Sequence, residues 1–83
     1  MTERRALTLI GRAYCHLCHE MEVALQPLLT EYDLALEVLD ADADSSLARY
    51  DEQVPVLLLG EAELCHYFLD EAAVRTALSG GNG

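Results

Sequence analysis

Two cysteines separated by two residues, Cys15 and Cys18, form the pattern in this sequence that is best suited to covalent chemistry. They follow a short apolar run and open a segment of helical periodicity. A cysteine in the first turn of a helix faces unpaired backbone N–H groups and the positive end of the helix dipole, and both favour the thiolate. The second cysteine returns after one turn within disulfide reach. We therefore predict that Cys15 attacks a disulfide and that Cys18 resolves the product.

The segments around the two cysteines predict seven elements. The apolar run at 6–10 is typical of a buried strand, and apolar residues recur at three- and four-residue steps from 17 to about 31. This amphipathic helix should be kinked or divided at Pro27. A strand at 34–40, a short helix at 45–50 and a hairpin of strands at 54–59 and 64–68 follow. Asp70 then caps a last helix, and residues 79–83 should fray.

This order of elements predicts an α/β fold, strand-helix-strand-helix-strand-strand-helix, with a mixed sheet. Right-handed crossovers make the first two strands parallel, the hairpin supplies antiparallel edges, and helices cover both faces. The length of 83 residues allows one domain, which we place at 1–79, followed by a flexible tail at 80–83.

Composition excludes several classes of function. The formal net charge is −10, and the chain has five arginines and no lysine, so a phosphate backbone is an unlikely ligand and we expect no nucleic-acid partner. No apolar run is long enough to span a bilayer, and we expect no membrane partner. Three cysteines are too few for a disulfide-stapled secreted domain, which favours a reducing, cytoplasmic location for this acidic protein.

The chain resembles a known family in three features: the first strand, the C-x-x-C motif that opens the first helix, and the pair Val54-Pro55 at the start of the third strand. Together they look like the thioredoxin fold in its short, glutaredoxin-like form, with a four-stranded sheet, over residues 6–79. The resemblance implies thiol-disulfide oxidoreductase activity. It also implies that Pro55 is cis and lies beside the nucleophile, and that the backbone of Val54 binds the substrate.

Three further residues take substrate-binding roles in this interpretation. Arg12 stands three residues before Cys15, where glutaredoxins usually carry a basic residue for the carboxylate of glutathione. Asp70 takes the place of the aspartate that the family has at the start of the last helix. Tyr14 precedes the motif and should cover the rim of the site.

The sequence also departs from the glutaredoxin pattern. Where the family has glycines that let glutathione approach the backbone, this chain carries the bulky residues Tyr67, Phe68 and Leu69. We therefore expect a protein or peptide disulfide as substrate and poor handling of glutathione, which stays a candidate reductant. No other cofactor and no metal are assigned.

Two alternatives use the same residues. Cys15, Cys18, Cys65 and His66 could form a Cys3His zinc site, with His16 or His19 as a substitute ligand. Alternatively, the chain is a redox-inactive module that holds a peptide in the cleft beside Pro55. Outside a metal site, Cys65 is best explained as a small buried hydrophobe.

Overall fold

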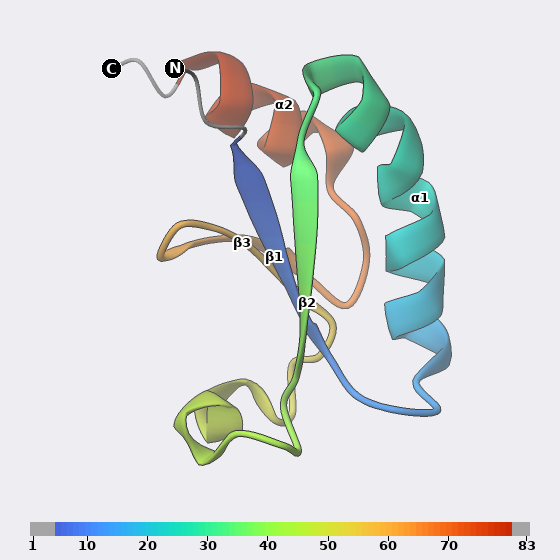
Figure 1. The fold of residues 1–83 in the computed structure, drawn as a ribbon, viewed down its shortest axis with the longest axis vertical. Coiled ribbons are helices and arrows are strands. Elements are labelled where there is room, and N and C mark those ends of the chain that lie inside the picture. The colour runs from blue at the N-terminus through green and yellow to red at the C-terminus, as the bar shows by residue number, and fades with distance from the viewer. Residues whose placement is uncertain (1–4, 81–83) are drawn as a thin grey trace.

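The computed structural model describes residues 5–80 and contains the seven elements in the predicted order (Figure 1). The predicted tail at 80–83 lies outside the described residues except for Gly80, which is the last residue of the final helix. The elements are β1 (Ala6–Gly11), α1 (His16–Tyr32), β2 (Ala35–Asp40), the 3-10 helix η1 (Ser45–Tyr50), β3 (Val56–Leu59), β4 (Ala62–His66) and α2 (Glu71–Gly80).

The four strands form one mixed sheet in the order β2-β1-β3-β4. As predicted, β1 and β2 are parallel, and β3 pairs with β4 as an antiparallel hairpin. The expectation that both hairpin strands lie at edges is wrong, because β3 also pairs with β1 and is therefore internal. This position fits the unbroken apolar sequence of β3, which is buried on both faces of the sheet.

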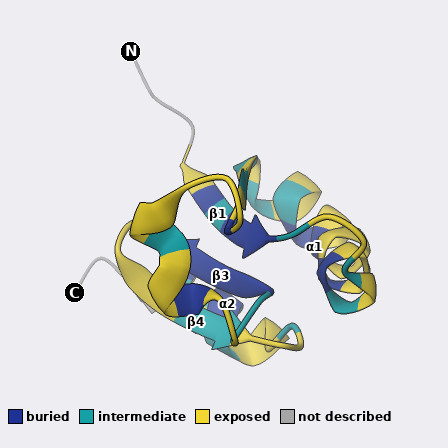
Figure 2. Cartoon of the chain, turned by 90° about the horizontal axis from the view of Figure 1, so that it is seen from below, coloured by how far each residue is buried: buried dark blue, intermediate teal, exposed yellow. Residues whose placement is uncertain are grey.

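Each face of the sheet has its own apolar cluster. On one face, alternate strand residues such as Leu7, Leu9 and Leu57 pack against both α1 and α2. On the other face, Ile10, Val56 and Leu58 pack against η1 and the segment before it through Tyr50 and Ala41. Both faces are thus covered. Within residues 5–80, the two α-helices share one face and η1 provides the helical cover of the other. Figure 2 shows β1 and β3 buried between these layers.

Helix α1 runs through Pro27 without division, so of the two predicted outcomes, a kink or a division, the division is wrong. Its buried face contains Cys18, Met21, Leu25 and Leu28, whereas Pro27 is exposed. The carbonyl that loses its hydrogen-bond donor is that of Val23, on the exposed side, where water can replace the missing N–H. In Figure 1 the helix bends over its last turns.

The hairpin is shorter than predicted. Strand β3 starts at Val56 instead of residue 54, and β4 covers 62–66 instead of 64–68. The chain reverses within two residues because Gly60 adopts a φ of 63°, a conformation that costs glycine little. Tyr67 directly follows β4 and adopts a φ of 67°. Its N–H donates to the carbonyl of Pro55 at 2.9 Å.

Within residues 5–80, no helix is long and apolar enough to cross a membrane.

Candidate functional site

Cys15 and Cys18 are joined by a disulfide at the start of α1, with their Cα atoms 5.2 Å apart. Cys15 is the N-cap residue in extended conformation, and its Sγ accepts a hydrogen bond from the backbone N–H of Cys18 at 3.1 Å. The sulfur therefore occupies the position of the oxygen of a conventional N-cap side chain, next to the unpaired amides of the first helical turn. The same geometry would stabilise a thiolate on Cys15 after reduction.

The two sulfurs differ in access. Cys15 is partly exposed, whereas Cys18 is 8% exposed and faces the end of β1. A Cβ atom added to Gly11 would lie 3.0 Å from the Sγ of Cys18, so the glycine permits this close packing. Gly11 was not predicted as a site residue. The available signal was its place as the last residue of the first strand, directly before the loop that leads to the cysteines.

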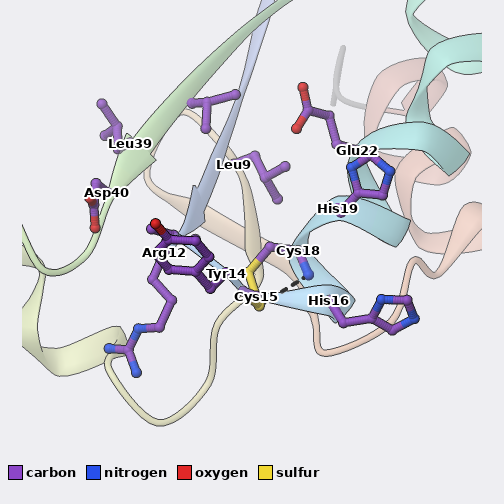
Figure 3. Close-up of a pocket in the computed structure, with 13 residues that line it drawn as sticks. Leu9, Arg12, Tyr14, Cys15, His16, Cys18, His19, Glu22, Leu39 and Asp40 are labelled. Atoms are coloured by element: carbon purple, nitrogen blue, oxygen red, sulfur yellow. Dashed lines mark hydrogen bonds between the residues drawn. A yellow bond between two sulfur atoms is a disulfide. The ribbon is translucent and has the colours of Figure 1, made fainter.

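A pocket of about 710 Å³ opens beside the disulfide (Figure 3). It lies between the first turns of α1 and the carboxyl ends of β1 and β2. Its lining consists of the loop before α1, the exposed side of the first helical turns and one strip of sheet: Leu9, Gly11, Arg12, Ala13, Tyr14, Cys15, His16, Cys18, His19, Glu22, Val38, Leu39 and Asp40. Of the residues predicted for the site, the pocket brings together Arg12, Tyr14, Cys15 and Cys18.

Arg12 lines this pocket, but its guanidinium is already engaged. Its Nη2 donates to Asp42 at 3.1 Å and also to Asp51, so it joins the loop before α1 to the segments that follow β2 and η1. The hydrogen bond from Arg12 to Asp51 raises the pKa of the guanidinium above its ordinary value. The predicted role of Arg12 in binding a ligand carboxylate would therefore require competition with two carboxylates of this chain.

Tyr14 is fully exposed at the rim of the pocket and adopts a φ of 61°. Val54 and Pro55 do not line the pocket. The bond between them is cis, as the resemblance implies. Pro55 is buried, and Val54 packs against the cluster on the η1 face. Their roles in substrate binding stay predictions.

Asp70 lies at the start of α2, as predicted, where its Oδ1 accepts a hydrogen bond from the N–H of Ala73 at 3.1 Å. It lines a different pocket, together with Cys65 and His66. Among residues 5–80 no group of three or more His, Cys, Asp or Glu side chains is placed to hold one metal ion. Cys65 was expected to be a small buried hydrophobe and is only partly buried, and this burial raises the pKa of its thiol.

Two histidines of α1 lie near the cysteines in sequence: His16 between them and His19 directly after Cys18. The Nε2 of His16 lies 2.7 Å from a carboxylate oxygen of Glu20, one turn further along the helix, and His19 lines the pocket. Other lining residues were also not predicted for the site, among them Leu9, Glu22, Val38 and Asp40. Pairing of β1 with β2 and the position of α1 over the sheet bring them together, and both depend on the three-dimensional fold.

Comparison with known proteins identifies the family of this chain. The family model of the Glutaredoxin-like domain (DUF836) matches residues 6–79. This chain belongs to that family. A solution NMR structure of the protein Ne2328 from Nitrosomonas europaea is 43% identical, with a TM-score of 0.82 and coverage of 95% of this chain and 96% of that one.

Two thioredoxin structures resemble the glutaredoxin-like chain in fold. Thioredoxin 1 from Thermosipho africanus is 18% identical, with a TM-score of 0.61 over 94% of this chain and 99% of its own. Fasciola hepatica thioredoxin is 15% identical, with a TM-score of 0.58 over 92% and 79%. At these identities the likeness establishes the thioredoxin-like fold alone. No curated protein matched the chain significantly.

Family, fold and the Cys15–Cys18 pair together fit a role in thiol redox chemistry.

Proposed function

We propose that this protein is a thiol-disulfide oxidoreductase in which Cys15 is the nucleophile and Cys18 the resolving cysteine. The observation that carries the proposal is the position of Cys15 as the N-cap of α1, with its sulfur accepting the N–H of Cys18 and with more exposure than the buried Cys18. An incoming disulfide can reach the partly exposed sulfur of Cys15, and the buried sulfur of Cys18 lies next to it. Asymmetry of this kind favours attack by Cys15.

The reaction is a two-step exchange. The Cys15 thiolate forms a bond to one sulfur of the substrate disulfide, and the bond between the two substrate sulfurs breaks, which releases one substrate thiolate. Cys18, after losing its proton, then attacks Cys15 and releases the second substrate thiolate. Two electrons pass from the cysteine pair to the substrate, and the two protons of the pair end on the released thiols. Two molecules of the monothiol glutathione, or one protein dithiol, restore the reduced pair and are themselves oxidised to a disulfide.

Trapping of the intermediate tests these roles. Reduced Cys18→Ser protein, mixed with a peptide disulfide, should accumulate a mixed disulfide on Cys15 that intact mass and peptide mapping identify. The matched Cys15→Ser variant retains Cys18 in its buried site and should form at least about tenfold less adduct in the same time. Equal trapping by both variants, or trapping only on Cys18, would contradict the assignment.

The redox-inactive alternative makes a different prediction. A module that only holds a peptide would show the same number of reactive thiols before and after mild reduction. We expect two more free thiols after reduction, because the Cys15–Cys18 bond is present in the oxidised protein.

A further inference from the structure

The sheet side of the pocket beside the disulfide is apolar: Leu9 and Val38 line it, and Leu9 is buried whereas Val38 is exposed. Leu9 of β1 and Val38 of β2 are register partners, so their side chains lie on the same face of the sheet, the face that packs against α1. Leu36, two residues earlier on the same edge strand, packs against the apolar cluster, but Val38 is 54% exposed. An exposed valine on the helix-covered face, close to a reactive sulfur, offers a contact site for an apolar side chain.

The rim of this pocket is acidic. Glu22 and Asp40 line it and form no ion pair with an arginine within residues 5–80, whereas Arg12 is bonded to Asp42 and Asp51. Asp40 does accept a hydrogen bond from the N–H of Asp42 at 2.8 Å, and, after the hydrogen bond to Asp51, its negative charge helps to raise the pKa of Arg12. His16 is paired with another carboxylate, Glu20. The lining residues and their ion-pair partners together contain one guanidinium, that of Arg12, and five carboxylates. The carboxylates are those of Glu20, Glu22, Asp40, Asp42 and Asp51. Such a rim attracts a cation and repels an anion.

We propose that this pocket selects the substrate by the residues next to its reactive cysteine, and that it prefers an apolar side chain followed by a basic one. The inference rests on the proposed oxidoreductase function. Cys15 lines the pocket, so a peptide whose sulfur is bonded to Cys15 can place its neighbouring side chain against the exposed Val38. A basic side chain one position further on then meets the rim carboxylates, Glu22 and Asp40.

The same arrangement disfavours glutathione. Its two carboxylates would face the acidic rim, and the guanidinium that could receive one of them, that of Arg12, is bonded to two aspartates. Charge complementarity therefore favours a cationic peptide disulfide over the anionic tripeptide.

Three short peptides with the sequences Cys-Leu-Lys, Cys-Leu-Glu and Cys-Ser-Lys, capped at both ends, provide the test. Each is joined through its cysteine to thionitrobenzoate, whose release is followed by absorbance during a single turnover with the reduced protein. The leaving group is identical in all three, so differences in rate report recognition of the peptide. We expect Cys-Leu-Lys to react about fivefold faster than Cys-Leu-Glu and about threefold faster than Cys-Ser-Lys at low salt. The charge preference should shrink at high salt.

Variants assign the preference to the pocket. The double variant Glu22→Gln with Asp40→Asn should reduce the lysine preference to less than twofold, and Val38→Ser should remove the leucine preference. Matched controls lie outside the pocket: Glu37→Gln on the other face of β2, and Val23→Ser, whose valine is 56% exposed on α1. Both controls should retain the wild-type ratios.

The outcomes separate this inference from the proposed function. If thionitrobenzoate is released from all three peptides at equal rates, or if the control variants change the ratios as much as the pocket variants, the pocket does not select substrate. If Cys15→Ser protein releases thionitrobenzoate as fast as wild type, the proposed function itself is wrong.

Discussion

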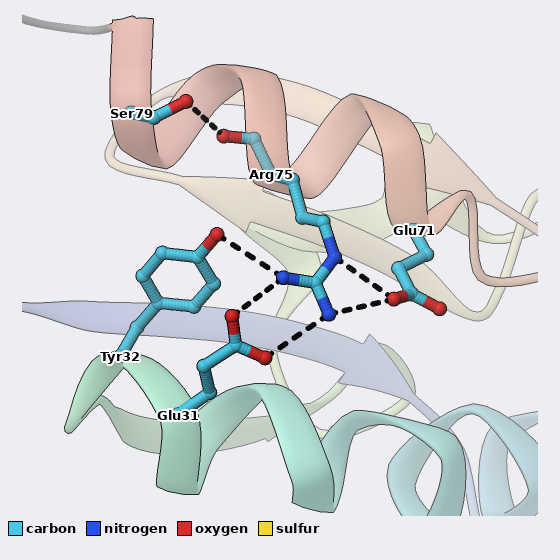
Figure 4. A network of polar contacts seen from close by, with 5 residues as sticks. All are labelled: Glu31, Tyr32, Glu71, Arg75 and Ser79. Atoms are coloured by element: carbon cyan, nitrogen blue, oxygen red, sulfur yellow. Dashed lines mark hydrogen bonds and ion pairs between the residues drawn. The ribbon is translucent and has the colours of Figure 1, made fainter.

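The carboxyl end of α1 is bound to α2 by a network of ion pairs, whereas its amino end borders an open pocket. At the carboxyl end, Arg75 of α2 donates from its Nη atoms to both carboxylate oxygens of Glu31, at 2.6 and 3.0 Å, and from Nε to Glu71 at 2.8 Å (Figure 4). At the amino end, the disulfide lies beside an open pocket, next to the fully exposed Tyr14.

The comparison shows how one helix can serve stability and reactivity separately. The apolar cluster shared by α1 and α2 includes Met21, Leu25 and Leu28 of α1 but not Cys18. The bond that would open and close during exchange therefore lies outside the main cluster. The carboxyl end of the helix is fixed to α2 by both apolar packing and the Arg75 network. The Cys15–Cys18 bond at the amino end can therefore open and close while the rest of the helix stays packed.

The largest effect should follow from removing the nucleophile. Cys15→Ser is expected to lower the rate of peptide disulfide reduction by at least about 1,000-fold, because serine cannot form the mixed disulfide. Turnover with dithiothreitol as electron donor measures this loss. Cys65→Ser is the matched control and should keep most of the activity, since Cys65 lines a different pocket. Comparable losses in both variants would contradict the separation of the two cysteine sites.

Gly11→Ala should come next. Its Cβ would lie 3.0 Å from the Sγ and 3.2 Å from the Cβ of Cys18, so the alanine must displace the cysteine. We expect a loss of about 1–3 kcal/mol in the free energy of unfolding and an equilibrium with dithiothreitol shifted toward the reduced pair. Gly60→Ala is the control, because the added Cβ meets nothing within 4 Å. It should cost stability through its φ of 63° but leave the redox equilibrium unchanged.

A smaller effect is expected at the other end of the helix. The hydrogen bond from Arg75 lowers the pKa of Glu31 in the folded protein. The ionised carboxylate therefore stabilises the folded state at any pH above the pKa that Glu31 has in the unfolded chain. This contribution is lost as the pH falls through the lower pKa of the folded state. Glu31→Gln should therefore lower Tm by a few degrees at most near pH 7, and by less at pH 3. A difference in Tm that grows on acidification would contradict this assignment. The redox equilibrium should not change.

The smallest effect concerns Arg12. Because its guanidinium is bonded to Asp42 and Asp51, Arg12→Gln should change the rate of reaction with glutathione disulfide by less than about threefold. Arg49→Gln, outside the pocket beside the disulfide, provides the reference for loss of one positive charge. A loss of more than about tenfold, specific to Arg12, would restore its role as an anchor for the glutathione carboxylate.

Much of the fold could be predicted because local signals agreed with one another. Apolar runs, helical periodicity and the Asp70 cap determined the order of elements, and the C-x-x-C motif with Val54-Pro55 indicated the family. The errors have physical causes. Periodicity does not encode strand order, so the internal position of β3 was missed, and Pro27 is tolerated because it lies on the exposed side of α1.

The site was predictable only in part. Cys15 and its place at the helix start follow from residues close in sequence. The floor and rim of the pocket do not, because Leu9, Glu22 and Val38 come from three elements that meet through tertiary packing. The pairing of Arg12 with Asp42 and Asp51 joins segments 30 and 39 residues away along the chain, and no local pattern indicates it.

Site-resolved alkylation of the reduced protein across a range of pH tests the roles of the two cysteines. Mass spectrometry of peptides after brief exposure to iodoacetamide gives a rate for Cys15 and Cys18 separately. The N-cap position of Cys15 predicts that it reacts faster and titrates below the ~8.5 of an ordinary thiol, within about 3.5 to 7.5. Faster reaction of Cys18, or titration of both thiols near 8.5, would contradict Cys15 as the activated nucleophile.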